Sequence, residues 1–271
     1  MTRIIPFLFL LVVNNNASAE WTPLDKGLEL GTFKAKQQSK IADSTFTILR
    51  INLEFWQLEL TGSSWDVKNK NQTVKEWSRS LGYKAAINAG MFATDYKTHI
   101  GYMAKENTFN NKHVNRYQSV AAFHPKKEGL PKFKIYDLDH EGTDFNTIKA
   151  NYSSIVQNLR LIKSKGENRW SQQNKKWSEA ALGIDANGNA LFIFSRTPFS
   201  MHDFNNELLS LNIDLVAAQH LEGGPEAQLY YRDNQKEVEL YGSFETGFVE
   251  DDDNNYSWPI PNVIGIKPRS N

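Results

Sequence analysis

The chain has 271 residues, with 31 basic and 31 acidic side chains and no cysteine. Without cysteine it can form neither a disulfide nor a thiolate metal site, so burial alone must hold the fold together. The balanced charge lacks the basic stripe that a nucleic-acid partner would require. No linker or low-complexity tract divides the sequence. We therefore expect one compact domain and no nucleic-acid partner.

The N-terminus predicts a secretory signal peptide over residues 1–19. Arg3 precedes a short apolar run at positions 4–13, and a polar stretch then ends in Ala17-Ser18-Ala19, a small-residue cleavage pattern. Cleavage after Ala19 removes one basic residue and leaves a net charge of −1. No segment is long and apolar enough to cross a bilayer. The sequence thus predicts a secreted or periplasmic domain over residues 20–271, without stable membrane insertion.

In chain order, the first elements form a strand, a helix and a second strand. Alternating apolar residues predict a strand over residues 45–60. Thr73 and Glu76 have the spacing of a capping box at the start of a helix, and Gly82 ends that helix. A short strand then leads into the polar turn Asn88-Ala89-Gly90.

A second segment has the same order of parts. Residues 180–184 and 190–194 predict a hairpin, because the turn between them contains Asn187-Gly188. Ser200 and Asp203 then mark the start of a helix with an apolar face. An apolar strand follows this helix, so the two segments share one pattern.

The glycine turn, residues 221–226, is the most informative stretch of the chain. It reads Leu-Glu-Gly-Gly-Pro-Glu and places two carboxylates, Glu222 and Glu226, around paired glycines. Glycines adopt positive φ angles without strain and let a ligand approach the backbone closely. The turn is therefore a candidate ligand site, with a plain acidic surface turn as the alternative.

The matching segments predict a duplicated strand–helix–strand unit with a pseudo-twofold axis. Ile51 and Asn88 are 37 positions apart, and Ile184 and Glu222 are 38 apart. If the unit is duplicated, the two polar turns lie together at the ends of adjacent central strands, whereas chance alternation would give no such contact. The expected fold class is α+β, with mixed sheets and flanking helices in a single domain.

Three blocks of this sequence resemble the signature blocks of the phosphodiester glycosidase family. The blocks are residues 86–92, 182–195 and 221–230, and the resemblance runs in the family's order from about Leu24 to the C-terminus. It implies a hydrolase that cleaves a glycosyl phosphodiester, a sugar-1-phosphate ester bond, in an envelope or extracellular glycan. A non-catalytic glycan-binding protein on the same fold is the alternative.

The chain departs from the family pattern in two places. Many members have an aspartate where this chain has Glu222, and commonly an arginine before the hairpin, where this chain has Trp177-Ser178-Glu179. A guanidinium binds phosphate through two parallel hydrogen bonds, which tryptophan and glutamate cannot do. Three other arginines are available to compensate: Arg160, Arg196 and Arg232.

The resemblance implies catalytic roles for Glu222, Asn88 and Glu226. A phosphate leaves more easily than an alkoxide, so one well-placed carboxylate suffices, and Glu222 would act as nucleophile or as base for water. Glu226 is either its partner or a solvated turn residue. Asn88 either donates its amide to the substrate or satisfies its own turn, as asparagine before glycine often does.

Further substrate-binding candidates lie at predicted turns and strand ends. They are Gly90, Asp185, Ser195, Arg196, His220, Gly223 and Gly224. The glycine N–H groups can hold an anion. On a regular strand His220 would point to the same face as Glu222. The plainer alternatives are a capping serine, a salt-bridged arginine and a paired buried histidine.

No metal or cofactor is predicted, and the expected partner is a carbohydrate or glycan-phosphate substrate. The six histidines lack ligand spacing, and the acidic run at residues 250–255 lacks the glycine and spacing of a calcium loop. Trp170, Trp177 and Trp258 fall in predicted loops, where an exposed ring can stack on a sugar, although such rings more often anchor their loop. The sequence leaves the oligomeric state open.

Overall fold

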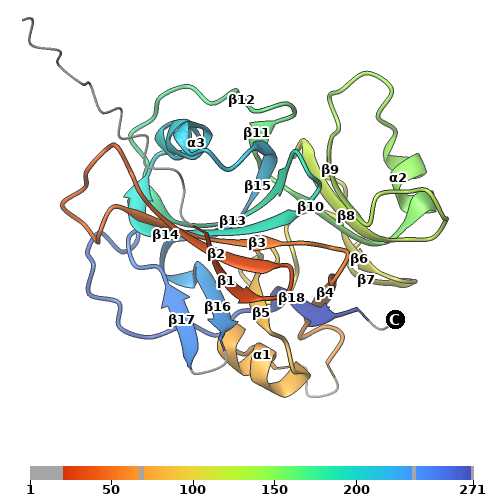
Figure 1. Ribbon diagram of the computed structural model, residues 1–271, viewed down its shortest axis with the longest axis horizontal. Helices are drawn as coiled ribbons and strands as arrows, with labels where there is room; N and C mark the ends of the chain where they lie inside the picture. The colour runs from red at the N-terminus through yellow and green to blue at the C-terminus, as the bar shows by residue number, and fades with distance from the viewer. Residues whose placement is uncertain (1–20, 67–69, 234–235, 270–271) are drawn as a thin grey trace, which may run out of the picture.

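The computed structural model describes residues 21–66, 70–233 and 236–269, so the predicted signal peptide lies outside the described residues. The described chain forms three sheets, with a helix lying against each of them (Figure 1). Every strand pairing in these sheets is antiparallel, a more uniform arrangement than the mixed sheets expected from the sequence. In the described part of the chain, no helix is long and apolar enough to cross a membrane.

The first sheet has eight strands and carries the glycine turn at one strand end. Its strands are β1 (Trp21–Asp25), β2 (Leu28–Lys34), β3 (Thr45–Ile51), β11 (Arg160–Lys163), β12 (Glu167–Asn168), β13 (Trp177–Asp185), β14 (Ala190–Phe199) and β15 (Leu215–Gly223). They lie in the order β1-β2-β3-β14-β13-β15-β11-β12. Helix α3 (Met201–Ser210) packs on this sheet through the buried Phe204 and Leu208. As predicted, Ser200 caps α3 by accepting the N–H of Asp203.

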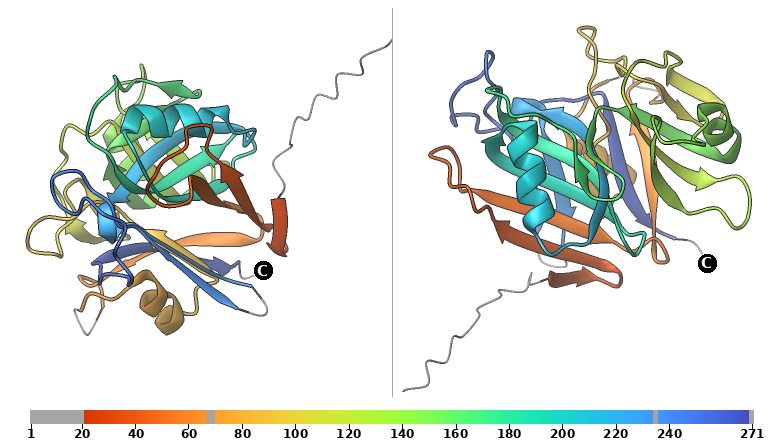
Figure 2. Two further views of the ribbon diagram at one scale, coloured as in Figure 1. Left: turned by 90° about the vertical axis from the view of Figure 1, so that its left-hand side faces the viewer. Right: turned by 90° about the horizontal axis from the view of Figure 1, so that it is seen from above.

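The other two sheets have five strands each. The second contains β6 (Met103–Lys105), β7 (Thr108–Asn111), β8 (Ser119–Pro125), β9 (Phe133–Asp137) and β10 (Tyr152–Asn158), in the order β7-β6-β10-β8-β9, with α2 (Phe145–Asn151) beside β10. The third contains β4 (Trp56–Gly62), β5 (Ala85–Asn88), β16 (Gln228–Arg232), β17 (Glu237–Tyr241) and β18 (Asn262–Pro268), in the order β17-β16-β5-β18-β4. Helix α1 (Val74–Leu81) covers the outer side of the third sheet, and the first sheet lies on the other side (Figure 2).

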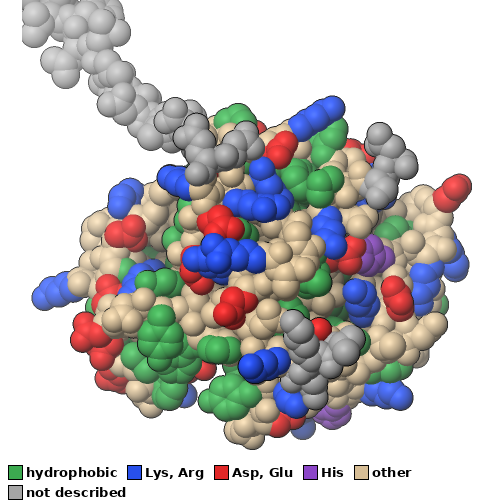
Figure 3. All heavy atoms as spheres, turned by 90° about the horizontal axis from the view of Figure 1, so that it is seen from below, with side chains coloured by type: hydrophobic (Ala, Val, Ile, Leu, Met, Phe, Trp, Pro, Cys, Tyr) green, Lys and Arg blue, Asp and Glu red, His purple; other side chains and the backbone are tan. Residues whose placement is uncertain are grey.

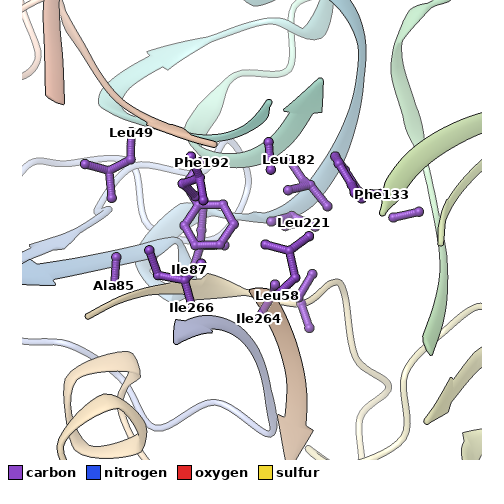
Figure 4. Packing of buried hydrophobic residues seen from close by; sticks show 14 of the residues in the cluster. Leu49, Leu58, Ala85, Ile87, Phe133, Leu182, Phe192, Leu221, Ile264 and Ile266 are labelled. Atoms are coloured by element: carbon purple, nitrogen blue, oxygen red, sulfur yellow. The ribbon is translucent and has the colours of Figure 1, made fainter. Parts of the chain in front are cut away.

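The main core lies between these sheets. Leu49, Leu182 and Phe192 of the first sheet face Ile87 and Ile264 of the third (Figure 4). The second sheet adds a buried phenylalanine from β9 to the same cluster. Alternating apolar residues of the facing sheets interdigitate. Removal of their apolar surface from water is the main favourable term in folding.

The structure corrects the strand predicted over residues 45–60. This stretch is two strands, β3 and β4, because Asn52 turns the chain between them and accepts the N–H groups of Phe55 and Trp56 at its carbonyl oxygen, both at 3.1 Å. The two strands lie in different sheets. The apolar alternation continues across the turn since Leu53 is also buried.

The strands on either side of the helix are arranged alike in the two segments from which a duplication was inferred. In the first segment β4 and β5 share the third sheet with β18 between them, and in the second segment β14 and β15 share the first sheet with β13 between them. The pseudo-twofold axis itself stays a prediction.

The predicted capping box of α1 is confirmed. The N–H of Glu76 donates to the Thr73 hydroxyl at 3.2 Å, and the N–H of Thr73 donates to the Glu76 carboxylate at 2.8 Å. Gly82 ends the helix with a φ of +70°. The cap and the end of α1 thus depend on residues that are close together in the sequence, which is why they could be predicted.

We expect Thr73→Ala to lower the free energy of unfolding by about 1 kcal/mol, because the N–H of Glu76 loses its acceptor at the helix start. Thr73→Ser keeps the hydroxyl and should stay within about 0.5 kcal/mol of the unmodified chain. Urea denaturation of the three proteins measures both differences. Equal losses for the two substitutions would show that the threonine methyl group, and not the cap, stabilises α1.

Candidate active site

The glycine turn lies against the end of β5, so strand ends of two sheets meet there. Asn88 donates its Nδ2–H to the carbonyl oxygen of Glu226 at 2.8 Å and accepts the N–H of Gln228 at Oδ1 at 2.6 Å. The two polar turns therefore lie together, as the sequence predicts. They come from different sheets and not from adjacent strands of one sheet. Because both amide atoms are occupied, Asn88 positions the turn.

The second sheet reaches the same place through β10. The Nδ2–H of Asn158, the last residue of β10, donates to the carbonyl oxygen of Ala89 at 3.0 Å. Gly90 follows with a φ of +150°, and a Cβ there would lie 2.4 Å from Oδ1 of Asn158 and 2.5 Å from Cε1 of His99. Glycine is thus required at position 90 by both the backbone angle and the close packing.

Buried polar atoms without a partner occur next to Gly90, at Asn158 and His99, and in β15, at Gln219. Within the described residues these atoms include Oδ1 of Asn158, Nδ1 of His99 and Nε2 of Gln219. Gln219 is linked to the second sheet by Ser119, which donates to its Oε1 at 3.1 Å. Burial lowers the pKa of His99 to about 4, so its ring is neutral at pH 7. Unpaired buried donors and acceptors are costly, and substrate hydroxyls are groups that can satisfy them.

Glu222 stands at the end of β15, partly buried, where it pairs with Ala180 of β13. Its Oε1 accepts the N–H of Gly223 at 3.1 Å. The pKa of Glu222 is raised to about 8, chiefly by burial; the charges of Glu226 and Glu245 contribute to this rise, and the charge of His220 opposes it. At pH 7 this carboxyl group is therefore mostly protonated.

Two more carboxyl groups share this environment. Burial raises the pKa of Glu226 to about 7, and it also raises the pKa of Glu245. Glu245 lies against the turn, because a Cβ on Gly224 would be 2.6 Å from its Oε2. Gly224 has a φ of +61°, which favours glycine. The absence of a Cβ also leaves room for the carboxylate of Glu245. Glu245 was not predicted as a site residue, because no motif marks it.

A buried ion pair lies beside the turn. His220 contacts Oε1 of Glu179 through Nδ1 at 2.6 Å, and the indole Nε1–H of Trp177 donates to Oε2 of Glu179 at 2.6 Å. Burial opposes the charge on each partner, and the charge of Glu179 raises the pKa of His220. With Nδ1 facing Glu179, Nε2 is the ring nitrogen left to face a ligand. Glu179 was noted in the sequence because it lies where the family commonly has an arginine. Its contact with His220 was not predicted.

The side chains of His220 and Glu222 were expected on the same face of a regular strand, but β15 has a bulge between them. Ala181 lies opposite His220 and Ala180 lies opposite Glu222, so Leu221 is an extra residue in β15. Strict alternation of faces is broken at such a bulge. The two groups nevertheless remain close enough for the charge of Glu222 to raise the pKa of His220.

Trp177 packs on the turn as the first residue of β13, where a loop was predicted. A Cβ on Gly223 would lie 2.6 Å from Cδ1 of the indole ring. Gly223 is opposite Glu179 in the sheet. The ring therefore anchors the turn and fixes the carboxylate of Glu179.

The structure does not bring Asp185 to this site. It lies at the opposite end of β13 from Glu179, six residues or roughly 20 Å away along the strand. Its carboxylate accepts the N–H groups of Asn187 and Asn189, both at 2.9 Å, and forms an ion pair with Arg50 at 3.4 Å. Asp185 thus holds the predicted hairpin turn together.

Ser195 and Arg196 are also committed to the fold. Ser195 is fully buried and donates to the carbonyl oxygen of Thr197 at 3.0 Å. The Nε–H of Arg196 donates to Asp252 at 2.7 Å, and its other nitrogens donate to backbone carbonyls of residues 241, 252 and 254. The guanidinium therefore fastens the acidic loop and has no free edge for a phosphate.

The described residues were also searched for a metal site and for an arginine that could bind phosphate at this turn. Among the described residues, no group of three or more histidines and carboxylates is placed to hold a metal ion. Arg160 pairs with Asp139 at 2.6 Å in the second sheet's region, and Arg232 is exposed at the end of β16. Neither arginine replaces the one missing beside Trp177.

Comparison with solved structures shows the fold. The catalytic domain of zebrafish N-acetylglucosamine-1-phosphodiester alpha-N-acetylglucosaminidase, auto-inhibited by its pro-peptide, is 15% identical with a TM-score of 0.61, covering 93% of this chain and 87% of that one. A hypothetical protein from Synechocystis is 14% identical with a TM-score of 0.54, covering 94% and 64%. Among curated proteins, no sequence matches the chain.

The family is shown by the sequence itself. The sequence model of the phosphodiester glycosidase family matches residues 81–267, more than half of the chain. This range contains Asn88, the glycine turn, Glu179 and Glu245. The chain therefore belongs to the phosphodiester glycosidase family.

Proposed function

We propose that this chain hydrolyses a glycosyl phosphodiester, a sugar-1-phosphate ester bond, in an envelope or extracellular glycan. Family membership supports the reaction class. The observation that carries the proposal is Glu222, whose pKa of about 8 makes it a proton donor at neutral pH beside two other partly buried carboxyl groups. Cleavage of the signal peptide after Ala19 would place the enzyme outside the cytoplasm, where such glycans occur.

The two carboxyl groups of the turn divide the acid and base roles. Glu222, the group with the higher pKa, donates a hydrogen bond or proton to the phosphate oxygen that leaves the anomeric carbon. Glu226 has a pKa near 7 and is partly ionised at neutral pH, so it activates the attacking water. Carboxyl groups whose environments separate their pKa values take such roles in glycoside hydrolysis. Asn88 acts by fixing the backbone around Glu226.

His220 supplies the positive charge that binds the phosphate. Glu179 holds its ring by Nδ1 and favours the imidazolium form, which leaves Nε2–H to donate to a phosphate oxygen. The N–H of Gly223 already donates to Glu222, so the N–H of Gly224 is the backbone donor that the turn adds. Asn158 and Gln219 offer unpaired buried atoms to the sugar hydroxyls.

The first test is Glu222→Gln, which keeps the shape of the side chain but removes the proton. We expect kcat/KM for a sugar-1-phosphodiester to fall at least about 100-fold, the usual contribution of a general acid. Release of reducing sugar and phosphomonoester measures the rate. Glu128→Gln, an exposed change, is the control.

Activity of Glu222→Gln within a few-fold of the unmodified chain would exclude Glu222 as the catalytic acid. An unmodified chain that binds phosphodiester glycans but releases no product would instead favour the glycan-binding alternative.

Glu179→Gln tests the charge on His220. The amide retains the volume and an acceptor for Nδ1, but the pKa of His220 falls without the carboxylate. We expect the alkaline limb of the pH profile of kcat/KM to move down by about 1 to 2 pH units. Glu179→Asp retains the charge and should restore much of the profile. An unchanged limb in Glu179→Gln would contradict the role of His220.

The pH dependence of the free energy of unfolding should also show that Glu222 is protonated in the folded state. Its folded pKa of about 8 lies above the ordinary glutamate value of 4.5, so between these values the folded state binds more protons and stability falls as pH rises. Glu222→Gln removes this penalty and should gain on the order of 3 kcal/mol relative to the unmodified chain between pH 5 and pH 8. Urea unfolding at several pH values measures it. Parallel stability curves for the two proteins would refute the raised pKa.

A further inference from the structure

Three aromatic side chains, Phe248, Tyr256 and Trp258, form a cluster that we call the aromatic platform. The ring of Trp258 stacks with Tyr256 at a centroid distance of 6.3 Å and an interplanar angle of 23°, and Phe248 meets it edge-on at 6.1 Å. Phe248 and Tyr256 are 58% and 59% exposed. Figure 3 shows hydrophobic side chains gathered beside acidic ones at its lower left, the edge along which the β17–β18 loop runs.

The platform is attached at one end to the glycine turn and at the other to Gln228, the first residue of β16, which follows the turn. Phe248 donates its N–H to the carbonyl oxygen of Glu245 at 3.1 Å, and the carboxylate of Glu245 lies against Gly224. At the other end, the Nε2–H of Gln228 donates to the carbonyl oxygen of Trp258 at 2.5 Å. The platform is therefore continuous with the site that holds Glu222.

The loop that carries the platform is also held from the first sheet. Arg196 donates to the side chain and carbonyl oxygen of Asp252 and to the carbonyl oxygen of Asn254. The N–H of Thr246 donates to the carbonyl oxygen of Lys176 at 3.0 Å, beside Trp177. A prearranged surface loses little entropy when a ligand binds. The hydrogen bonds from the Arg196 guanidinium to this loop therefore serve to hold the platform in place.

We propose that the aromatic platform is a subsite for a neutral sugar ring adjoining the scissile phosphodiester. A pyranose has a flat face of C–H groups that matches an exposed aromatic ring, and its hydroxyls find acceptors in the acidic run beside it. The negative charge of Glu250, Asp251 and Asp253 disfavours an anionic occupant, whereas Asp252 is paired with Arg196. The assignment of the linked group rests on the proposed function.

Direct binding tests the subsite without requiring catalysis. Intrinsic tryptophan fluorescence and calorimetry would follow titration of neutral di- to tetrasaccharides of hexoses and N-acetylhexosamines. We expect the double change Phe248→Ala and Tyr256→Ala to raise the Kd at least about tenfold. Both rings are more than half exposed, so folding should be retained. Phe55→Ala, at an exposed ring of the β3–β4 turn, is the matched control and should bind normally.

Kinetics separate this inference from the proposed function. We expect the double variant to raise KM for a phosphodiester bearing an oligosaccharide and to leave turnover of a sugar-1-phosphate methyl ester unchanged. If the unmodified chain hydrolyses neither ester, the proposed function fails while the binding titration still decides the subsite. The subsite is overturned if the unmodified chain binds no oligosaccharide of the panel at millimolar concentration, if the double variant binds equally well, or if the rings mediate only self-association.

Discussion

The two hydrogen bonds of the Asn88 side chain are the contact on which the candidate site depends. They satisfy a carbonyl oxygen and an N–H group of the turn, and buried backbone groups of this kind are almost always paired. Asn158 continues the connection to the second sheet. Because strands of all three sheets are tied at this point, side chains far apart in sequence are held in one place by the main framework of the fold.

Burial then determines the chemistry of the groups collected there. Loss of water raises the pKa values of Glu222, Glu226 and Glu245, and nearby negative charges add to this effect at Glu222 and Glu226. Glu179 and His220 escape the cost of an isolated buried charge by pairing with each other. These shifts favour a neutral carboxyl group at Glu222 beside an imidazolium at His220, a combination that suits the anionic leaving group of the proposed reaction.

The sequence predicted the features that local signals encode. The cap of α1, the β13–β14 hairpin and the glycine turn follow from side chains within a few residues of one another. Glu179 and Glu245 could not be assigned in this way, since they reach the turn from segments separated by many residues and no motif marks their contacts. Arg196 shows the converse error: its strand-end position suggested a ligand, but its partners come from the distant acidic loop.

The departures from the family pattern are physically connected. The stretch that commonly carries an arginine carries Glu179 here, and that carboxylate contacts His220, two residues before Glu222. An arginine keeps its charge at every physiological pH, whereas an imidazolium depends on its neighbours. On the proposed mechanism, recognition of the phosphate therefore requires protonated His220 and protonated Glu222 together. Since raising the pH removes both protons, the same buried carboxylates that create the acid also confine its activity to a limited pH range.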